Sequence, residues 1–415
     1  MPTRSTPTNA PPPIRLAVAL DGAGWHPAAW READARPTEL FTPRYWTELV
    51  QEAEWGLLDF VTIEDSLAIQ SSRRGRVDER TDQVRGRLDA ALIAARVAPS
   101  TSSIGIVPVT TTTHTEPFHV SKAIASLDYV SHGRAGLQAR VSATDLEARQ
   151  FGRRVIPNYA FSTSTESAES TQGTAIEDLF DEAAEFIEVV RRLWDSWEDD
   201  AEIRDVASGR FIDRDKLHYI DFEGPHFSVK GPSITPRPPQ GQPLVSVLAH
   251  VPVAFALAAR SADLVFVTPK TTDVARTLVS TVRSHEDAVG RTDPPLRIFA
   301  DLVVFLDDDA ATALARKERL DDLDGYPLRS DALIFSGSPD ELVELMVEWR
   351  AAGIDGFRLR PGTIPHDLDY IAHELVGALQ DRSAFRSHYD DTTLRARLGL
   401  TRPANRYATS EPAAL

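Results

Sequence analysis

Residues Ile104 to Gly152 have the sequence IGIVPVTTTTHTEPFHVSKAIASLDYVSHGRAGLQARVSATDLEARQFG, and this stretch decides the fold of the chain. It begins with an apolar run through Val109, continues with the polar residues Thr110 to His114, and becomes helix-like after Pro117. A second apolar run, Ala135 to Val141, ends in another polar cluster. This order of strand, loop, helix and strand is typical of a crossover between parallel strands. Because ligands bind at the carboxyl ends of parallel strands, we expect a binding site where the polar residues gather.

The alternation of strand and helix continues on both sides of this stretch. Upstream, Ile14–Leu20 and Leu57–Ile63 are apolar runs that predict buried strands. Near the end of the chain, Ser338, Pro339 and Glu341 have the cap, first-turn proline and capping-box spacing of a helix start. Eight strand candidates, mostly separated by helices, predict an α/β fold of the (β/α)8 TIM-barrel type with insertions. They lie near residues 14, 57, 104, 135, 243, 263, 296 and 355.

The composition excludes several classes of function. The chain has 415 residues, 42% of them hydrophobic, and a net charge of -17, which argues against nucleic acid or an anionic membrane as a partner. The absence of cysteine excludes disulfides, thiolate metal sites and a cysteine nucleophile. No run approaches about 18 continuous apolar residues, and MPTRSTPTNAPPP at the start lacks the apolar region of an export signal. We therefore expect a cytoplasmic protein whose residues 1–13 are a disordered leader.

We expect a single barrel domain over residues 14–380 with two excursions. One is a Ser/Thr-rich loop in residues 152–176, and the other is residues 198–242, which are rich in turn formers. Thr174 and Glu177 form a capping-box pattern that predicts the start of a long amphipathic helix. Trp194 and Trp197 lie on the apolar stripe of that helix and are expected in the core. Residues 381–415 are expected to be a C-terminal extension that packs on the barrel.

Five longer motifs carry a resemblance to a known family. They are EPFHVSKAIASLDYVSHGRAG at 116–136, ATDLEARQFG at 143–152, EFIEVVRRLWDSWEDDA at 185–201, GPSITPRPPQGQP at 231–243 and FRSHYDDTTLRARLGL at 385–400. With these motifs the chain resembles the bacterial-luciferase-like flavin monooxygenases, in the branch of the nitrilotriacetate and dibenzothiophene-sulfone monooxygenases. The resemblance covers residues 14 to 400.

The resemblance implies a cofactor, a reaction and partners. FMN is expected in its reduced form, FMNH2, supplied by a separate NAD(P)H:flavin reductase. One oxygen atom of dioxygen is then inserted into a small organic substrate. Such chemistry requires an apolar site from which water is excluded. By the same analogy the protein is expected to be a homodimer.

The positions that match the family's flavin contacts are mostly apolar in this chain. Asp65 occupies the place of an Asp that lies beside the flavin ring. Val109 stands where the family has a flavin-contacting Thr, with Thr110 directly behind it. Phe180 matches a flavin-contacting Tyr, and Val251 matches a phosphate-binding Ser. Two further matches are also apolar, with Ile176 in the place of a His and Ala254 in that of a Gly. Since buried phosphate without donors costs several kcal/mol, other groups are needed to bind it.

Four polar residues are candidates for these missing contacts. Arg140 on the fourth strand, followed by Ser142, is a hypothetical phosphate ligand, because guanidinium groups bind phosphate in a bidentate manner. The alternative for Arg140 is an ion pair with a barrel carboxylate. His250 is a candidate hydrogen-bond donor to flavin or substrate, or a loop histidine without function. His114 is a candidate catalytic residue at the flavin edge or oxygen pocket. His119 is expected to pack or cap, and its spacing from His114 predicts no metal site.

Two charged pairs leave alternatives open. Arg358 and Arg360 alternate on the eighth strand, where they bind an anion or form salt bridges with a neighbouring helix. Glu64 and Asp65 could be the acid and base of a hydrolytic barrel, although adjacent strand residues point to opposite sides. The sequence contains no Walker A or GxGxxG pattern, so it does not indicate phosphate binding by a glycine-rich loop.

Two other functions compete with the monooxygenase. One is a hydride-transfer oxidoreductase of the same fold that uses a deazaflavin coenzyme. The other is a barrel that has lost FMN catalysis and serves as a binding protein. In the larger relatives an insertion after the seventh strand covers the mouth, but here only residues Asp324 to Phe335 stand at that place. The loops Arg73–Arg87 and Arg153–Gly173 are therefore the candidate lids.

Overall fold

The structure, a computed structural model, describes residues 13–73, 75–156 and 171–408. The predicted leader, except for its last residue, and most of the Ser/Thr-rich loop lie outside these ranges. Among the helices that the structure does describe, none is both long and apolar enough to cross a membrane.

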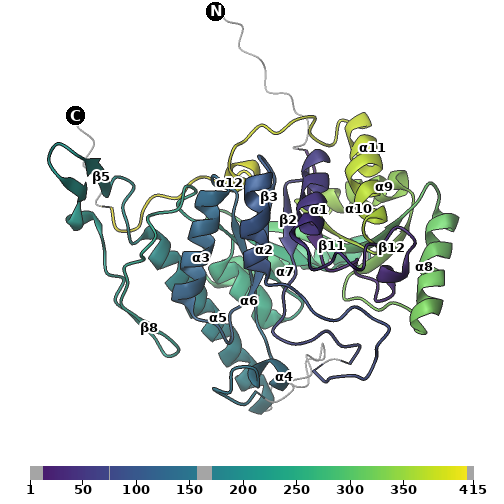
Figure 1. The fold of residues 1–415 in the computed structure, drawn as a ribbon, viewed down its shortest axis with the longest axis horizontal. Coiled ribbons are helices and arrows are strands. Elements are labelled where there is room, and N and C mark those ends of the chain that lie inside the picture. The colour runs from purple at the N-terminus through teal and green to yellow at the C-terminus, as the bar shows by residue number, and fades with distance from the viewer. Residues whose placement is uncertain (1–12, 74, 157–170, 409–415) are drawn as a thin grey trace, which may run out of the picture.

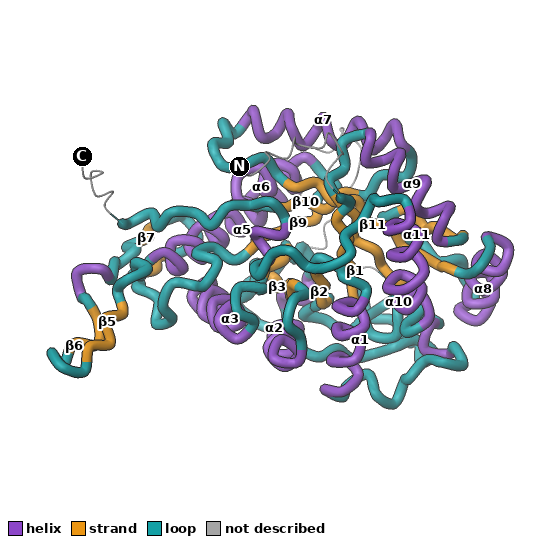
Figure 2. Tube along the Cα trace, turned by 90° about the horizontal axis from the view of Figure 1, so that it is seen from above, coloured by secondary structure: helices purple, strands orange, loops and turns teal. Residues whose placement is uncertain are grey.

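Eight parallel strands close into a barrel, which confirms the predicted (β/α)8 fold. Each strand pairs with the next one, and the last pairs with the first. Figure 2 shows these strands enclosed by helices. In order around the barrel they are β1 (Arg15–Leu20), β2 (Phe60–Ile63), β3 (Gly105–Thr111), β4 (Gly136–Arg140), β9 (Leu244–Leu248), β10 (Leu264–Val267), β11 (Arg297–Leu306) and β13 (Gly356–Pro361).

The outer layer consists of the helices that connect these strands (Figure 1). They are α1 (Pro43–Trp55), α2 (Ala90–Val97), α3 (Pro117–Val130), α5 (Thr171–Asp195), α6 (Pro252–Ser261), α7 (Thr272–Ala288), α8 (Ala310–Asp324), α9 (Pro339–Ala351) and α10 (His366–Tyr370), which continues through a π-helical turn (Ile371–Leu375) into α11 (Val376–Asp381). Shorter helical turns are Ala29–Arg31, Ala98–Ser100, α4 (Asp145–Ala148), Arg214–Lys216 and α12 (Leu394–Arg397). The predicted capping box of Ser338 and Glu341 is present at the start of α9.

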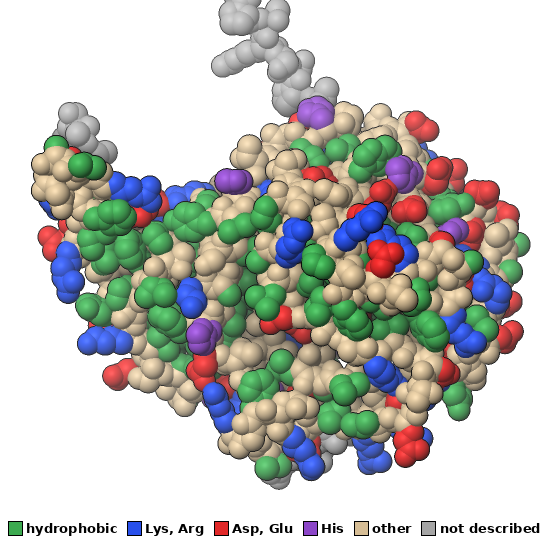
Figure 3. Space-filling model, in the orientation of Figure 1, with side chains coloured by type: hydrophobic (Ala, Val, Ile, Leu, Met, Phe, Trp, Pro, Cys, Tyr) green, Lys and Arg blue, Asp and Glu red, His purple; other side chains and the backbone are tan. Residues whose placement is uncertain are grey.

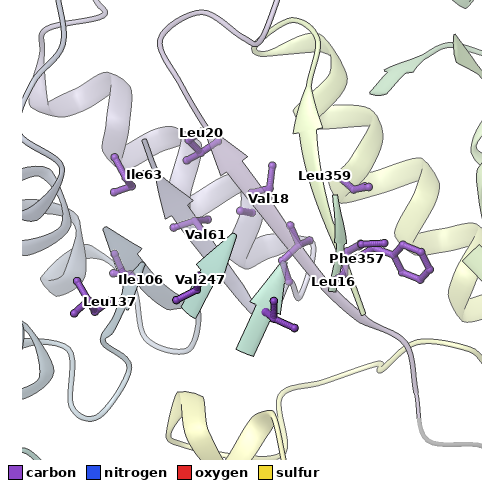
Figure 4. Packing of buried hydrophobic residues seen from close by; sticks show 14 of the residues in the cluster. Leu16, Val18, Leu20, Val61, Ile63, Ile106, Leu137, Val247, Phe357 and Leu359 are labelled. Carbon is purple, nitrogen blue, oxygen red and sulfur yellow. The ribbon is translucent and has the colours of Figure 1, made fainter. Parts of the chain in front are cut away.

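Strand register separates the residues that face the helices from those that face the barrel interior. The helix-facing side is apolar and mostly aliphatic, and Figure 4 shows part of it as one packed cluster, with Leu16, Val61 and Leu359 among the labelled residues. Alternate residues form the interior, where Phe60 and Phe266 belong to a separate apolar cluster near the amino-terminal end. Side chains alternate along each strand. The inward-facing residues nearer the carboxyl end of each strand therefore line the mouth.

Three local predictions were wrong. An additional strand, β12 (Leu333–Gly337), was not among the eight strand candidates; it pairs in parallel with the second half of β11, because β11 extends past the end of its neighbour β10. Helix α5 begins at Thr171, so Thr174 is not its cap. Trp194 is buried as predicted, but Trp197 follows the end of α5 and donates from Nε1 to the carbonyl oxygen of Ser233 (2.8 Å).

The segments outside the barrel pattern lie at its side and base. Residues 198–242 contain two small antiparallel ladders, β5 (Glu202–Asp205) with β6 (Arg210–Ile212) and β7 (Phe222–Glu223) with β8 (Ser228–Val229). After α11 the chain crosses the amino-terminal end of the barrel. There Leu394, Leu398 and Leu400 join the interior apolar cluster. Figure 1 shows α12 at this end and α4, which follows β4, at the opposite end, where the mouth lies.

Candidate active site

A buried ionic network occupies the barrel interior beneath the mouth. The Arg358 guanidinium donates to both carboxylate oxygens of Asp301 (2.8 and 2.5 Å) and to Oε1 of Gln138 (2.5 Å). It also lies 3.7 Å from the ring centroid of Phe266. Arg358 is only 1% exposed and Asp301 is completely buried. Of the two alternatives for Arg358, an anion or a salt bridge, the structure shows a salt bridge. Its partner lies on the neighbouring strand rather than on a helix.

Arg360 extends this network to the rim of the mouth. Its guanidinium bonds to Asp301 and to Asp331 (2.7 Å), and it covers the ring of Trp25 at 4.7 Å. Burial alone would lower the pKa of Arg360, but the charges of Asp301 and Asp331 raise it above its ordinary value. Asp331 in turn lies 3.4 Å from Nε2 of His250. Both arginines therefore have carboxylate partners, and their charges are offset.

His250 lies at the rim, as the sequence predicted. Its Nδ1 is 3.2 Å from the hydroxyl of Thr268, which follows the next strand. Its side chain is 39% exposed. Burial lowers the pKa of His250, although Asp331 acts in the opposite direction. The imidazole is thus held between two fixed partners and keeps an accessible edge.

Arg140 forms the ion pair that was the alternative to phosphate binding. It binds both carboxylate oxygens of Glu147 (2.9 and 3.1 Å) and donates to the hydroxyl of Thr111 (3.0 Å). Burial would raise the pKa of Glu147, but the charge and hydrogen bonds of Arg140 lower it. Ser66 also donates to Glu147 (2.8 Å), so this carboxylate joins the loops after β2 and β4. Because Glu147 offsets its charge, Arg140 has no unpaired charge to offer a phosphate.

His114 is buried at the end of β3 with an unsatisfied nitrogen. Its side chain stacks on Phe151 (centroids 5.2 Å apart) and is 7% exposed. In the described part of the chain, Nε2 has no hydrogen-bond partner. Burial, followed by the charge of Arg154, lowers the pKa of His114. Next to it, the Thr113 hydroxyl accepts from the backbone N–H of Ser142 (2.8 Å), which joins the ends of β3 and β4. A buried imidazole nitrogen without a partner is suited to a ligand that hydrogen-bonds there.

The two adjacent carboxylates after β2 have different surroundings. Asp65 accepts backbone N–H groups of Ser66 (2.7 Å) and of Ala90, at the start of α2 (3.1 Å). Glu64 instead points toward the barrel network, with Oε1 3.8 Å from Arg358. Burial raises the pKa of both carboxyl groups. They do not form a working acid–base pair, and the Asp65 carboxylate is already committed to backbone donors.

The remaining candidates, three apolar residues and Thr110, lie in different places. Val109 is buried and pairs with Gln138, an interior residue, so it faces the inside of the barrel. Phe180 is buried in α5, and Val251 is the residue before α6, at the N-cap position, where its side chain cannot cap the helix. Thr110 pairs with Ala139, which belongs to the helix-facing cluster. Thr110 therefore points away from the mouth, contrary to its predicted role as a flavin contact.

A cavity of about 910 Å³ opens beside the mouth. Its walls come from residues 21–27 after β1, from residues 70–73 and 78–85 after β2, and from Asp324 at the end of α8 with residues 326–329 after it. The candidate lid Arg73–Arg87 forms one of these walls. Arg80 and Gln83 bind it to the carboxylate of Asp324 (3.0 and 2.7 Å). Sequence reasoning missed Trp25 and Asp301, although an aspartate inside the apolar strand Leu296–Leu306 signals a buried cationic partner.

The comparisons with known proteins agree with this barrel and site. A family model described as luciferase-like monooxygenase matches residues 23–326. N-acetyl-S-(2-succino)cysteine monooxygenase of Bacillus subtilis is 30% identical, over 95% of this chain and 98% of its own length. Nitrilotriacetate monooxygenase component A of Aminobacter aminovorans is 29% identical, with the same coverage of 95% and 98%. The chain belongs to the luciferase-like monooxygenase family, which confirms the resemblance, and is thus an oxidoreductase.

Solved structures confirm the fold. Long-chain alkane monooxygenase superposes with a TM-score of 0.81 at 22% identity, covering 94% of this chain and 96% of the other. Riboflavin lyase, solved with modified FMN and riboflavin, gives a TM-score of 0.80 at 24% identity, covering 95% and 97%.

The residues at the mouth fit a flavin in their chemistry. The orphaned Nε2 of His114 can bond to a polar ring edge, and the inward-facing Val109 offers an apolar surface. The first turn of α6 has no side-chain cap, and such helix starts bind phosphate through their N–H groups.

Proposed function

We propose that this protein is the oxygenase component of a two-component monooxygenase. It uses FMNH2 from a separate NAD(P)H:flavin reductase and inserts one oxygen atom of dioxygen into a small organic substrate. The observation that carries the proposal is the buried, unpartnered Nε2 of His114 at the mouth of a luciferase-like barrel. The word component in the name of the nitrilotriacetate relative supports a separate reductase. We place the protein in the cytoplasm, where reduced flavin is available.

In this proposal the cofactor lies across the ends of β3, β4 and β9. Val109 and Phe180 provide apolar surface for the ring, and Ser142 and the start of α6 at Val251 provide donors for the phosphate. His114 hydrogen-bonds to the ring edge. Bound FMNH2 supplies the electrons that activate dioxygen. The chain contributes by holding the ring and excluding water from it, since water would divert the reaction.

His250 is placed beside the reacting atoms, where it holds or donates a proton at Nε2. Asp331 and Thr268 fix its two ring nitrogens, so the imidazole keeps one orientation. Because burial lowers its pKa, His250 is the neutral imidazole in this proposal, and the proton that it carries at Nε2 is the one that it donates.

Binding of the flavin tests the proposal. Anaerobic calorimetry of the purified protein with FMN and FMNH2 should give micromolar or tighter binding of the reduced form. His114→Ala should weaken it by about tenfold, the value of one hydrogen bond in a buried site. His388→Ala, which removes an exposed histidine at the barrel base, is the matched control and should bind as the wild type does. Absence of FMNH2 binding in the wild type contradicts the proposal.

Turnover and cofactor binding together distinguish the competing functions. Turnover with a deazaflavin coenzyme but not with FMNH2 would establish the hydride-transfer alternative. Failure to bind FMN, FMNH2 and deazaflavin would leave the degenerate binding protein.

We further propose a homodimer formed through α2 and α3. Leu92 on α2 is 71% exposed and Val130 on α3 is 44% exposed. On α3, His119, Ala123 and Ser126 are also exposed, at helical spacing. Figure 3 shows this side of the molecule, where green hydrophobic side chains lie on the surface over these helices. Analytical ultracentrifugation should give a dimer, and Leu92→Arg should give a monomer. A monomeric wild type would refute this part.

A further inference from the structure

The cavity beside the mouth has a distinctive charge arrangement. Four arginines and four carboxylates line its three walls. Most of these charges are already paired. Asp21 binds Arg87 behind the wall (2.6 Å), Asp78 binds Arg85, and Asp324 binds Arg80 (3.0 Å). Paired charges of this kind have little left to offer a ligand.

Two lining arginines are exceptions. Arg73, from the loop after β2, and Arg329, from the loop after α8, are exposed. Within the described residues neither guanidinium has a hydrogen-bond or ion-pair partner. Glu79 is the lining carboxylate that likewise lacks one there. Two unpaired cations therefore stand against one unpaired anion, although the protein as a whole has a net charge of -17. A local excess of positive charge in an acidic protein favours anionic ligands at this point.

Each of the three walls also contributes an apolar side chain to the cavity. Trp25 donates from Nε1 to the carbonyl oxygen of Ala19 (2.9 Å), and its ring is covered by Arg360 of the barrel network. Val84 and Leu328 contribute from the other two walls. A volume of about 910 Å³ is within the range of cavities that bind small molecules.

We propose that this cavity is the substrate site and that its substrates are small amphipathic oxyanions, carboxylates or sulfonates. Arg73 and Arg329 bind the anionic group from two sides, since guanidinium pairs with such oxygens in a bidentate manner. The apolar body of the substrate lies against Trp25. This inference rests on the proposed monooxygenase function, because it assigns the substrate of that site.

Direct binding tests it without flavin. The probes are 3-phenylpropionate, 2-phenylethanesulfonate and the neutral 3-phenylpropionamide, titrated into the wild-type protein by calorimetry at low salt. At least one anion should bind about tenfold more tightly than the amide, as expected for a charge-assisted hydrogen bond. Arg73→Gln and Arg329→Gln should each reduce this preference several-fold, and the double variant should lose it.

The control is Arg76→Gln, which changes an exposed arginine of the same loop that does not line the cavity. It should keep the full preference. All variants should bind FMNH2 as the wild type does, so loss of anion binding is separated from failure of the cofactor proposal. Equal binding of the amide and both anions to the wild type, or an unchanged preference in the double variant, would overturn the inference.

Discussion

Arg358 and Asp301 form a bidentate ion pair between β13 and β11 in the centre of the barrel, where both side chains are buried. The pair replaces part of the aliphatic packing that usually fills such an interior. A second guanidinium, that of Arg360, shares the same carboxylate. Asp301 therefore pairs with two cations that are almost completely buried.

Asp301→Asn should strongly destabilise the protein. The substitution keeps the volume but leaves two buried guanidinium groups without their shared counter-charge, which costs about 3–5 kcal/mol of unfolding free energy. Urea unfolding followed by circular dichroism measures it. Asp273→Asn, at a carboxylate that is 91% exposed on α7, should change stability by less than about 1 kcal/mol. Equal effects of the two substitutions would contradict a role for the network in stability.

The unfolding free energy should depend on pH through Glu147. Its pKa is lowered in the folded state from an ordinary value of 4.5, so its pairing with Arg140 stabilises the fold fully above that pH. This contribution is lost as pH falls through the lowered pKa. The difference in unfolding free energy between wild type and Glu147→Gln should thus be largest at neutral pH and shrink below 4.5. Glu318→Gln, the same substitution at an exposed glutamate of α8, is the matched control for the change from Glu to Gln.

Val251→Ser should restore a polar contact at the start of α6. A serine at this capping position accepts a backbone N–H and stabilises the helix by about 1 kcal/mol. If the proposed phosphate position is correct, FMNH2 affinity should rise several-fold in calorimetry. Val253→Ser, inside the first turn, should not increase it. A Val251→Ser protein with greater stability but unchanged affinity would place the phosphate elsewhere.

Leu394→Ala should weaken the base of the barrel. Leu394 is completely buried against Gly105 and Phe60, and its truncation leaves a cavity that costs about 2–5 kcal/mol. Leu314→Ala, at a leucine of α8 that is 47% exposed, should be nearly neutral. Thermal unfolding of both variants gives the comparison.

Asp324→Asn should loosen the wall of the cavity formed by residues 75–85. It removes the carboxylate that Arg80 and Gln83 share, so that the contact of this wall with α8 is reduced to the bond from Arg80 to the backbone carbonyl oxygen of residue 324. Amide hydrogen exchange should become faster in these residues while α8 itself keeps its protection. Unchanged exchange would show that the ion pairs of Arg85 and Arg87 hold the loop alone.

The barrel was predictable because its signals are local. Each strand is a short apolar run, and several helices have a side-chain cap of their own, as at Ser338. β12 was missed because its pairing depends on the length of β11, a property of a distant segment. Helix α5 was placed too late because a good capping pattern at Thr174 lies inside a longer helix.

The candidate site was predictable in position more than in detail. His114 and His250 do lie at the carboxyl ends of β3 and β9, since loop order places them there. The partners of Arg140 and Arg358 were not predictable, because Glu147 and Asp301 are selected by three-dimensional register. Thr110 was predicted to face the flavin, but it faces the helices. Successive residues of a strand face opposite sides, so the neighbour Val109 takes the inward position instead.

The seal at the base of the barrel has a consequence for synthesis on the ribosome. The inward-facing residues of the first strands, such as Ala17 and Phe60, are covered by Leu394, Leu398 and Leu400, which follow them by more than three hundred residues. The ion-pair partner of the Asp59 carboxylate, Arg386, likewise lies near the end of the chain. Until those residues leave the exit tunnel, a nascent chain carries an open apolar well at one end of its barrel, a surface that chaperones recognise.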